Sequence, residues 1–364
     1  MIIDTTLREG AQQFGTYFDI SLRKRIIIGL ARLGVEEIEL GWVGQDGLEE
    51  LAVWASKNVT GSALSVWTPC RDQDLRAAAA LPVDRVNIGV PVSDAHITTR
   101  LGLDRRTLVE RATRSVLAAK LAGIKYVSVG LEDLSRADID FALSVGMAVK
   151  VMGASRIRLA DTVGVLTPLE MADLVKRFRD TLDMDIAVHC HDDFGMGTGN
   201  GVAALAAGAD YADGSLLGIG ERSGIAKTEE LAAWRELREA KGRYDMAGLR
   251  RLCAEVAEPA GMNIPRTKAV AGSDIFSCES GLHVHALSKD PGLFEPYDPE
   301  VVGANRRLEV GGKSGTGAVK QMLRDRGVAC PETGLEKVVE AVRNLSLKLR
   351  RPLSADELAG LVEG

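Results

Sequence analysis

The feature that most constrains the fold is a repeat of strand-like and helix-like segments, with a period of about 30 residues. Apolar runs typical of buried strands end near Arg8, Gly41, Trp67, Val92, Glu132, Thr162, His191 and Gly220. Helix-like stretches lie between them, such as residues 22–33, 108–122, 168–182 and 201–207. Eight such repeats predict an α/β fold, a closed (β/α)8 TIM barrel. An open doubly wound sheet has a similar pattern, but no G-x-G-x-x-G follows the first strand.

Composition and charge exclude several classes of function. The net charge is −6, so no basic surface typical of a nucleic-acid partner is expected. No apolar run approaches the ~18 residues of a membrane span, and the chain opens on a strand pattern instead of a signal peptide. The cysteines are odd in number and widely spaced, which favours reduced thiols and a cytoplasmic location. They are Cys70, Cys190, Cys253, Cys278 and Cys330.

The repeat ends near residue 240. We therefore assign residues 1–240 to a catalytic barrel and residues 241–364 to a C-terminal subdomain, mostly helical. Helices are predicted at 245–258, 318–326, 335–347 and 355–362. Residues 272–317 are rich in Gly, Pro and Ser and predict an irregular arm, which is usually functional or inter-subunit. This arm holds His283 and His285, although a solvent-exposed pair fits the spacing equally well.

Three residues far apart in the chain are candidate ligands of a divalent metal. Glu9 follows the first predicted strand, and His189 and His191 end the seventh. Residues i and i+2 of a strand share a face, so both imidazoles point one way and Cys190 the other. Functional residues of a barrel gather at the carboxyl ends of its strands, where these side chains can meet. Two imidazoles and a carboxylate suit a catalytic Mg, Mn or Zn ion, the alternative being a half-buried polar strand end.

Several motifs resemble those of the homocitrate/2-isopropylmalate synthase family. They are D-T-T-L-R-E-G (4–10), L-A-D-T-V-G-V-L-T-P (159–168), V-H-C-H-D-D (188–193) and L-G-I-G-E-R-S-G (217–224). The runs V-S-V-G-L-E-D-L-S-R-A-D (127–138), E-S-G-L-H-V (279–284) and D-P-E-V-V-G (298–303) are most similar to bacterial homocitrate synthases of the nitrogen-fixation type. The motifs occur in the same order as in the family, and the resemblance extends to about residue 320.

The resemblance implies an activity and its partners. Family members are metal-dependent barrels that condense an acyl-CoA with a 2-oxo acid and then hydrolyse the thioester. They are dimers whose C-terminal region reaches the partner's barrel. We therefore expect acetyl-CoA and 2-oxoglutarate as substrates, homocitrate as the product, a metal that polarises the 2-oxo carbonyl, and a homodimer.

Three residues are catalytic candidates on this resemblance. Arg8 matches an arginine that stabilises the developing alkoxide, the alternative being a salt bridge under the barrel mouth. Glu132 matches an active-site glutamate that orients the acetyl group or relays a proton, although pairing with a nearby Arg or Lys is equally compatible. His283 resembles the family histidine that reaches the barrel mouth, where an imidazole can exchange protons near neutral pH.

Five residues are candidates for binding the 2-oxo acid. Thr162 resembles the family residue whose hydroxyl binds the substrate carboxylate, and Arg8 directly precedes the candidate metal ligand Glu9. Ser93 and His96 follow the fourth strand and fit the family pattern as pocket residues, although a contact at the start of a helix explains His96 equally well. Arg71, after the third strand, is a candidate for the distal carboxylate of a dicarboxylic 2-oxo acid.

Some positions depart from the family pattern. Phe294 stands where a tyrosine is usual after the arm histidine, which leaves the general acid or base unassigned. Ile225 replaces an asparagine near the metal. Ser128 and Gly130 stand where lysine-pathway homocitrate synthases have Arg and Ser, so the arginine that binds 2-oxoglutarate in that branch is missing.

Alternatives to homocitrate synthesis remain at this stage. Oxaloacetate differs from 2-oxoglutarate by one methylene, worth only ~1–3 kcal/mol in a pocket, so a Re-type citrate synthase is the nearest rival. Synthases of 2-isopropylmalate or citramalate follow. The hydroxymethylglutaryl-CoA lyase branch uses a loop cysteine after the eighth strand, and residues 217–224 contain none. A non-catalytic metabolite-binding barrel is the most distant alternative.

Overall fold

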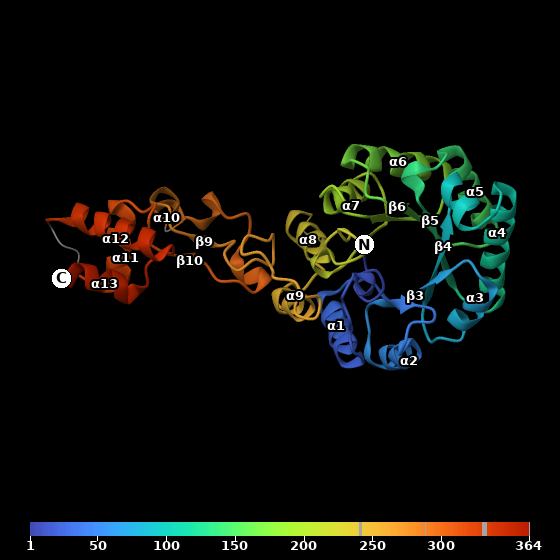
Figure 1. The fold of residues 1–364 in the computed structure, drawn as a ribbon, viewed down its shortest axis with the longest axis horizontal. Coiled ribbons are helices and arrows are strands. Elements are labelled where there is room, and N and C mark those ends of the chain that lie inside the picture. Colours follow the sequence, from blue (N-terminus) through green and yellow to red (C-terminus); the bar gives the residue numbers. More distant parts are fainter. Residues whose placement is uncertain (240–241, 288, 330–332, 364) are drawn as a thin grey trace. The chain divides into compact units, whose positions relative to one another are not determined.

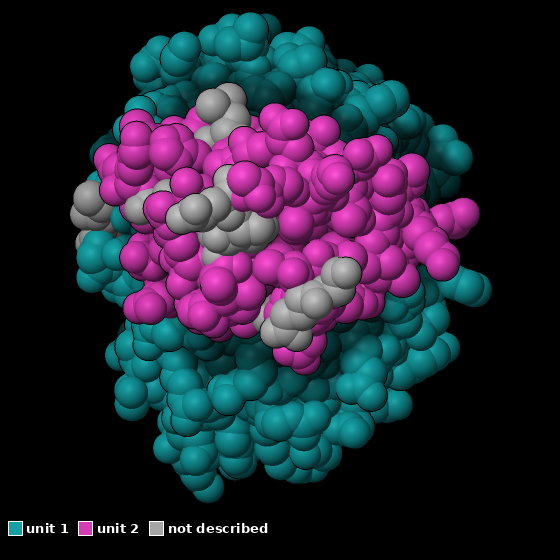
Figure 2. Space-filling model, turned by 90° about the vertical axis from the view of Figure 1, so that its left-hand side faces the viewer, with its two compact units in different colours: residues 1–264 teal, residues 265–364 magenta. Residues whose placement is uncertain are grey.

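The structure is a computed structural model that describes residues 1–239, 242–287, 289–329 and 333–363. It divides into two compact units, Met1–Ile264 and Pro265–Gly364, coloured teal and magenta in Figure 2. We call them the barrel unit and the C-terminal unit. The boundary between the units lies further along the chain than residue 240, the boundary assigned from the sequence. The reason is that helix α9 (Leu249–Ala257) packs on α1 (Ile20–Leu33). Gly29 allows this approach, since a Cβ there would lie 2.6 Å from Leu252 Cδ1.

The barrel unit contains a closed barrel of eight parallel strands in sequence order. The strands are β1 (Ile2–Asp4), β2 (Glu37–Trp42), β3 (Ala63–Pro69), β4 (Arg85–Pro91), β5 (Tyr126–Glu132), β6 (Arg156–Asp161), β7 (Asp185–Cys190) and β8 (Tyr211–Gly214). Strand β8 pairs with β1, with Asp4 opposite Gly214, and this pairing closes the barrel. The predicted TIM barrel is confirmed.

Helices surround the strands, as Figure 1 shows. Those not yet given are α2 (Leu48–Asn58), α3 (Asp72–Ala79), α4 (Arg105–Leu121), α5 (Ile139–Val151), α6 (Pro168–Thr181), α7 (Gly197–Ala206) and α8 (Thr228–Ala233). Local sequence sets several of their ends. Thr167 and Glu170 form a capping box at the start of α6, with Pro168 in the first turn, and Asp19 caps α1. No described helix is both long enough and apolar enough to cross a membrane.

The interior of the barrel carries buried charges that the sequence analysis did not single out. Glu37 and Glu39 alternate along β2, and Arg156 and Arg158 alternate along β6. All four side chains are buried. Arg156 donates to both carboxylate oxygens of Glu37, at 2.7 and 3.0 Å. Such pairing is what permits buried charges, because each one alone would lose its hydration without compensation.

The C-terminal unit has a small helical core and short elements in the predicted arm. Its elements are β9 (Ser277–Cys278), α10 (Gly281–Leu287), β10 (Arg307–Leu308), α11 (Thr316–Asp325), α12 (Leu335–Leu349) and α13 (Ala355–Glu363). Strands β9 and β10 pair in parallel. Val319, Leu323 and Val342 are fully buried in the core between the helices. Four cysteines are free thiols, whereas Cys330 lies outside the described residues.

Candidate active site

A turn after β1 brings Arg8 and Glu9 to the same side. The strand predicted to end near Arg8 ends at Asp4, because a turn begins there. The Thr6 amide donates to the Asp4 carboxylate at 2.9 Å, and the Arg8 amide donates to the Thr5 carbonyl at 3.0 Å. The alternation of a regular strand is therefore lost, and both side chains line one cavity.

The carboxylate of Glu9 is held from two directions. Arg8 Nη1 donates to its Oε2 at 2.6 Å, and the backbone amide of Glu221 donates to its Oε1 at 3.1 Å. Gly220 leaves room for this contact, since a Cβ there would lie 3.1 Å from the Glu9 side chain. Burial opposes the charge of Glu9, but Arg8 and the two histidines outweigh it and lower the pKa to about 2. Glu9 is therefore an ionised, fixed oxygen donor.

The two histidines face Glu9 from the end of β7. His189 Nε2 lies 3.7 Å from Glu9 Oε2, and His191 Nε2 lies 4.0 Å from Glu9 Oε1. The second ring nitrogen of His189, Nδ1, is 2.8 Å from the carboxylate of Asp213 on β8. That carboxylate is ionised, because Arg158 and His189 overcome the effect of burial and lower its pKa. Asp213 can therefore only accept a hydrogen bond, so the proton of His189 is on Nδ1. The lone pair on Nε2 is then free and faces Glu9.

These three residues fit a divalent metal ion. One ligand atom from each lies within 4.8 Å of the others, and all three side chains are buried. Burial, reinforced by the nearby His189, lowers the pKa of His191 to about 4, so its imidazole is neutral and can ligate. The His191 Nδ1 and Asp213 Oδ1 atoms are buried without a hydrogen-bond partner. Two nitrogen donors and one oxygen donor form a ligand set suited to a divalent metal ion.

The candidate ligands line a cavity of about 310 Å³ at the carboxyl ends of the strands. Six of the residues predicted from the sequence line it: Arg8, Glu9, Glu132, Thr162, His189 and His191. The sequence analysis missed Asp213, which orients His189, and Glu39, which accepts a 2.6 Å hydrogen bond from Arg8 Nε. The available signal for Glu39 was the spacing of two glutamates on one face of β2.

Glu132 is the last residue of β5, and Thr162 directly follows β6, the neighbouring strand. Glu132 pairs with Arg100 at 2.9 Å, so the ion pair considered from the sequence is present. Thr162 Oγ1 accepts the backbone amide of Asp133 at 2.8 Å. That bond uses an oxygen lone pair and leaves the hydroxyl proton available to an acceptor in the cavity.

Ser93, His96 and Arg71 are placed elsewhere. The Ser93 hydroxyl donates to the Asp133 carboxylate, and His96 Nε2 lies 3.7 Å from the same carboxylate. Both residues therefore support the backbone that carries Glu132, and neither lines the cavity. The Arg71 side chain is 60% exposed and turns toward α3, where it pairs with Asp74 at 2.5 Å. The structure thus does not bring Arg71 to the cavity.

His283 belongs to the C-terminal unit, in α10. Its ring packs edge-on against Phe294, with ring centroids 4.3 Å apart. Phe294 is the residue that replaces the usual tyrosine, so this histidine has an apolar neighbour where the family pattern provides a hydroxyl.

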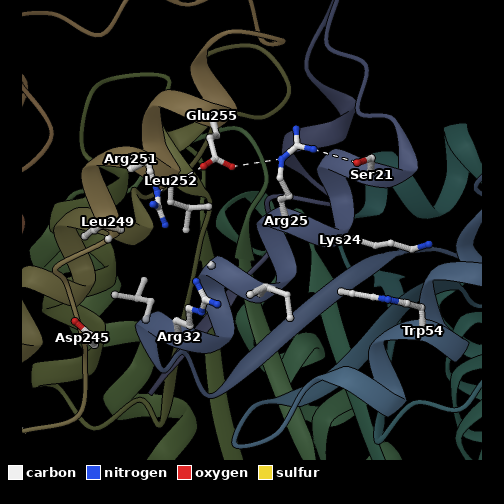
Figure 3. A pocket seen from close by; sticks show the side chains of 14 residues that line it. Ser21, Lys24, Arg25, Arg32, Trp54, Asp245, Leu249, Arg251, Leu252 and Glu255 are labelled. Carbon is white, nitrogen blue, oxygen red and sulfur yellow. Dashed lines mark hydrogen bonds and ion pairs between the residues drawn. The ribbon is translucent and has the colours of Figure 1, made fainter.

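A second cavity of the barrel unit lies on its outer surface between α1 and α9 (Figure 3). Its volume is about 570 Å³, larger than that of the cavity with the histidines. Arg25 and Arg251 both pair with Glu255 at its edge, at 3.6 and 3.7 Å. None of the residues predicted to act in catalysis lines it, so size alone does not locate the chemistry of this molecule.

Two family models match the chain. The HMGL-like family matches residues 1–256, which include every barrel strand and the candidate metal ligands. The chain belongs to the HMGL-like family. A second model, homocitrate synthase post-HMGL domain-like, matches residues 270–349 of this HMGL-like chain.

Curated relatives of this HMGL-like chain match all or nearly all of its length. It is 36% identical to homocitrate synthase 1 of Nostoc sp., over 100% of the chain and 97% of the relative. It is 34% identical to 2-isopropylmalate synthase 2 of Caldanaerobacter subterraneus, over 100% of the chain and 94% of the relative. Homocitrate synthase AksA of Methanopyrus kandleri is 35% identical over 95% of the chain and 87% of the relative.

Solved structures of HMG-CoA lyases share the barrel fold. The Bacillus subtilis enzyme aligns with a TM-score of 0.64 at 20% identity, covering 73% of this chain and 95% of the lyase. An HMG-CoA lyase from Acinetobacter baumannii, solved with coenzyme A and 3-methylmalate, also aligns at 0.64, with 19% identity, covering 73% of this chain and 92% of the lyase. At this identity the likeness concerns the fold alone.

Proposed function

We propose that this chain condenses acetyl-CoA with 2-oxoglutarate to give homocitrate, and hydrolyses the resulting thioester. The arrangement of Glu9, His189 and His191 beside Arg8 at the barrel mouth carries the proposal. Homocitrate synthases among the full-length relatives support this choice of reaction. A divalent ion held by these three ligands supplies Lewis acidity toward the carbonyl of the 2-oxo acid.

The residues around the ligands have distinct roles in this reaction. Arg8 is held by Glu9 and Glu39, each at 2.6 Å, so its permanent charge is fixed before substrate binds. A preorganised cation stabilises the negative charge that develops on the carbonyl oxygen during carbon–carbon bond formation. The hydroxyl of Thr162 binds the C1 carboxylate. Glu132, restrained by Arg100, orients the acetyl group.

Proton transfer requires a further group, and we assign it to His283. Condensation removes a proton from the acetyl methyl group and delivers one to the new alkoxide, and an imidazole can do either near neutral pH. His283 is an exposed histidine of α10 and is the one that matches the family residue; Phe294 packs against its ring.

We also propose that the enzyme works as a homodimer in the cytoplasm. Leu293 and Phe294, next to His283 in the arm, are 59% and 50% exposed. Exposed large apolar side chains in one segment are typical of a surface that a second subunit covers. The free thiols of Cys70, Cys190, Cys253 and Cys278 support a reducing compartment. Light scattering on the purified protein tests the dimer.

The decisive experiment measures release of free CoA from acetyl-CoA with a panel of 2-oxo acids. The panel contains 2-oxoglutarate, oxaloacetate, 2-oxoisovalerate and pyruvate, each with and without a metal chelator. We expect metal-dependent release that is fastest with 2-oxoglutarate. Preference for 2-oxoisovalerate would favour the second candidate, 2-isopropylmalate synthesis, which the relative from Caldanaerobacter supports. No release with any acid would end the proposal.

A further inference from the structure

Arg158 lines the cavity with hydrogen-bonding capacity that the protein leaves unused. A guanidinium has five N–H donors. Arg158 Nη1 donates to Glu39 Oε1 at 3.2 Å, but Nε and Nη2 are buried without a hydrogen-bond partner. The Nε atom is 3.3 Å from Asp213 Oδ2, close enough for charge attraction but not aligned for a hydrogen bond. Buried donors of this kind are rare in folded proteins unless a further group satisfies them.

The two carboxylates near Arg158 already serve other partners. Glu39 accepts 2.6 Å hydrogen bonds from Arg8 on one oxygen and from Asn87 on the other. Asp213 accepts from His189. Arg158 is therefore a buried cation whose two neighbouring carboxylates also serve Arg8 and His189. A further anion would be stabilised more strongly beside Arg158 than beside Arg8.

Two neighbouring strands carry a glycine at the level of this cation. Gly130 on β5 is in register with Arg158 on β6, and Gly89 on β4 is in register with Gly130. Both glycines line the same cavity. At Gly89 a Cβ would lie 2.3 Å from the Glu132 carboxylate and 2.6 Å from the Trp67 ring, so packing explains that glycine.

Packing does not explain Gly130. Its φ is not positive, and a Cβ there would meet nothing nearer than the Ile88 carbonyl oxygen, at 3.8 Å. Neither backbone conformation nor a close neighbour requires glycine at this position. The absence of a side chain instead leaves a hollow in the same layer as Arg158.

We propose that Arg158 binds the distal carboxylate of the 2-oxo acid, with the methylene chain of the substrate lying in the hollow at Gly130. This inference rests on the proposed function and assigns the residue by which the site selects a dicarboxylic substrate. A distal carboxylate satisfies the unused donors of Arg158, whereas a monocarboxylic 2-oxo acid leaves them buried and unpaired. The sequence analysis expected Arg71, after β3, to bind this carboxylate; the proposal assigns that role to Arg158 on β6.

The test compares two acids that differ only in the distal carboxylate, 2-oxoglutarate and 2-oxovalerate. Calorimetry on the full-length, metal-loaded protein gives their dissociation constants, independently of turnover. In Arg158→Met we expect the constant for 2-oxoglutarate to rise roughly 10- to 100-fold while that for 2-oxovalerate changes less than about threefold. Arg106→Met, an exposed arginine of α4, is the control and should change neither.

Metal content, measured on the same samples, separates substrate binding from a structural role. Equal losses for both acids together with lower metal content would mean that Arg158 acts only through Asp213 and His189, and would overturn the proposal. A selective loss for 2-oxoglutarate in Arg71→Met, with Arg158→Met unaffected, would overturn it as well.

A second variant keeps the test valid if Arg158→Met does not fold. Gly130→Val retains the guanidinium but fills the hollow, so both five-carbon acids should bind at least about tenfold more weakly while pyruvate binds as before. Unchanged binding of 2-oxoglutarate would contradict the proposal. Failure of the proposed function looks different: 2-oxoglutarate would bind in an Arg158-dependent manner without any release of CoA. If the enzyme turned over monocarboxylic acids only, the proposed condensation would stand, but the role of Arg158 would be rejected.

Discussion

At the scale of single residues, the site depends on groups that fix the protonation and direction of others. Asp213 is an example: its carboxylate sets which nitrogen of His189 carries the proton, and so directs the other nitrogen at Glu9. Asp213 is not one of the three candidate metal ligands. Its contribution is therefore measurable as metal affinity.

We expect Asp213→Asn to weaken divalent metal binding by roughly 10- to 100-fold, because the imidazole loses its anionic acceptor. Metal titration of the apoprotein measures this. The matched control is Asp210→Asn, which changes a carboxylate that caps Ile186 and pairs with Arg179 at the amino ends of the strands. Its metal affinity should equal that of the wild type. Equal affinities in all three proteins would remove Asp213 from the site.

Asp4 provides a residue-scale prediction about pH. It is fully buried and accepts hydrogen bonds from Thr228 and Thr6, and burial raises its pKa to about 6 from 3.8. The folded state therefore holds this proton more tightly than the unfolded state. Its stabilising effect is complete below about pH 4 and is lost as the pH rises through 6.

Asp4→Asn removes this titration. Relative to the variant, we expect the wild type to lose up to ~3 kcal/mol of unfolding free energy between about pH 4 and pH 7. Denaturant unfolding at each pH measures the difference. Asp104→Asn, at the exposed start of α4, is the control: hydrogen bonds from Thr107 lower the pKa of Asp104, so its contribution to stability falls only below about pH 4. The difference between this variant and the wild type should therefore stay nearly constant between about pH 4 and pH 7. A constant difference between wild type and Asp4→Asn across this range would contradict the account.

At the scale of elements, the loop after β8 positions one of the candidate metal ligands, Glu9. It runs through Gly218, Gly220 and Gly224 and places the Glu221 amide on Glu9. Gly224 has φ +78°, and a Cβ there would lie 1.7 Å from the Gly218 carbonyl oxygen. The loop therefore cannot keep this path with any larger residue at position 224.

A pair of glycine variants isolates the effect of the close approach between Gly224 and the Gly218 carbonyl oxygen. Gly15 has nearly the same φ, +79°, with nothing within 4 Å of its Cβ position. We expect Gly15→Ala to cost ~1–2 kcal/mol from backbone strain alone, and Gly224→Ala to cost ~3 kcal/mol or more, since overlap adds to the strain. Only Gly224→Ala should also weaken metal binding. Denaturant unfolding and metal titration measure both effects, and similar costs for the two variants would show that the loop moves freely.

The elements also indicate how far sequence reasoning reaches. Periodic apolar runs predicted the barrel and the two histidines, because the alternation along β7 is local information. The end of β1 was not predicted, since hydrogen bonds of Thr5 and Thr6 start a turn inside an apolar run. The partners of Arg158 were not predictable either. Glu39 and Asp213 lie on strands distant from Arg158 in the sequence, and only closure of the barrel brings them near it.

At the scale of the whole molecule, the candidate metal ligands and the proposed proton-transfer residue belong to different compact units. The candidate metal ligands Glu9, His189 and His191 all belong to the barrel unit. His283, the proposed proton-transfer residue, belongs to the C-terminal unit. Metal binding and turnover should therefore respond separately to changes in the two units. The family motifs identified both sets of residues, and the end of the strand–helix repeat near residue 240 already predicted that His283 lies outside the barrel.

We expect His283→Ala to lower kcat by ~10²–10⁴-fold, the usual contribution of general acid–base catalysis, without changing metal content or the binding of 2-oxoglutarate. The matched control is His285→Ala, which removes another exposed histidine, two residues further along α10. Its kcat should stay within about threefold of the wild type, a bound that applies if only His283 transfers protons.

The pH dependence of kcat distinguishes catalysis from structural support. If His283 transfers the proton, its alanine variant should lose a limb of the pH–rate profile that wild type and His285→Ala retain. A parallel fall of kcat and metal content would instead mean that His283 stabilises the fold. If both alanine variants lose the same limb, the imidazoles act interchangeably, and the assignment of proton transfer to one position of α10 fails.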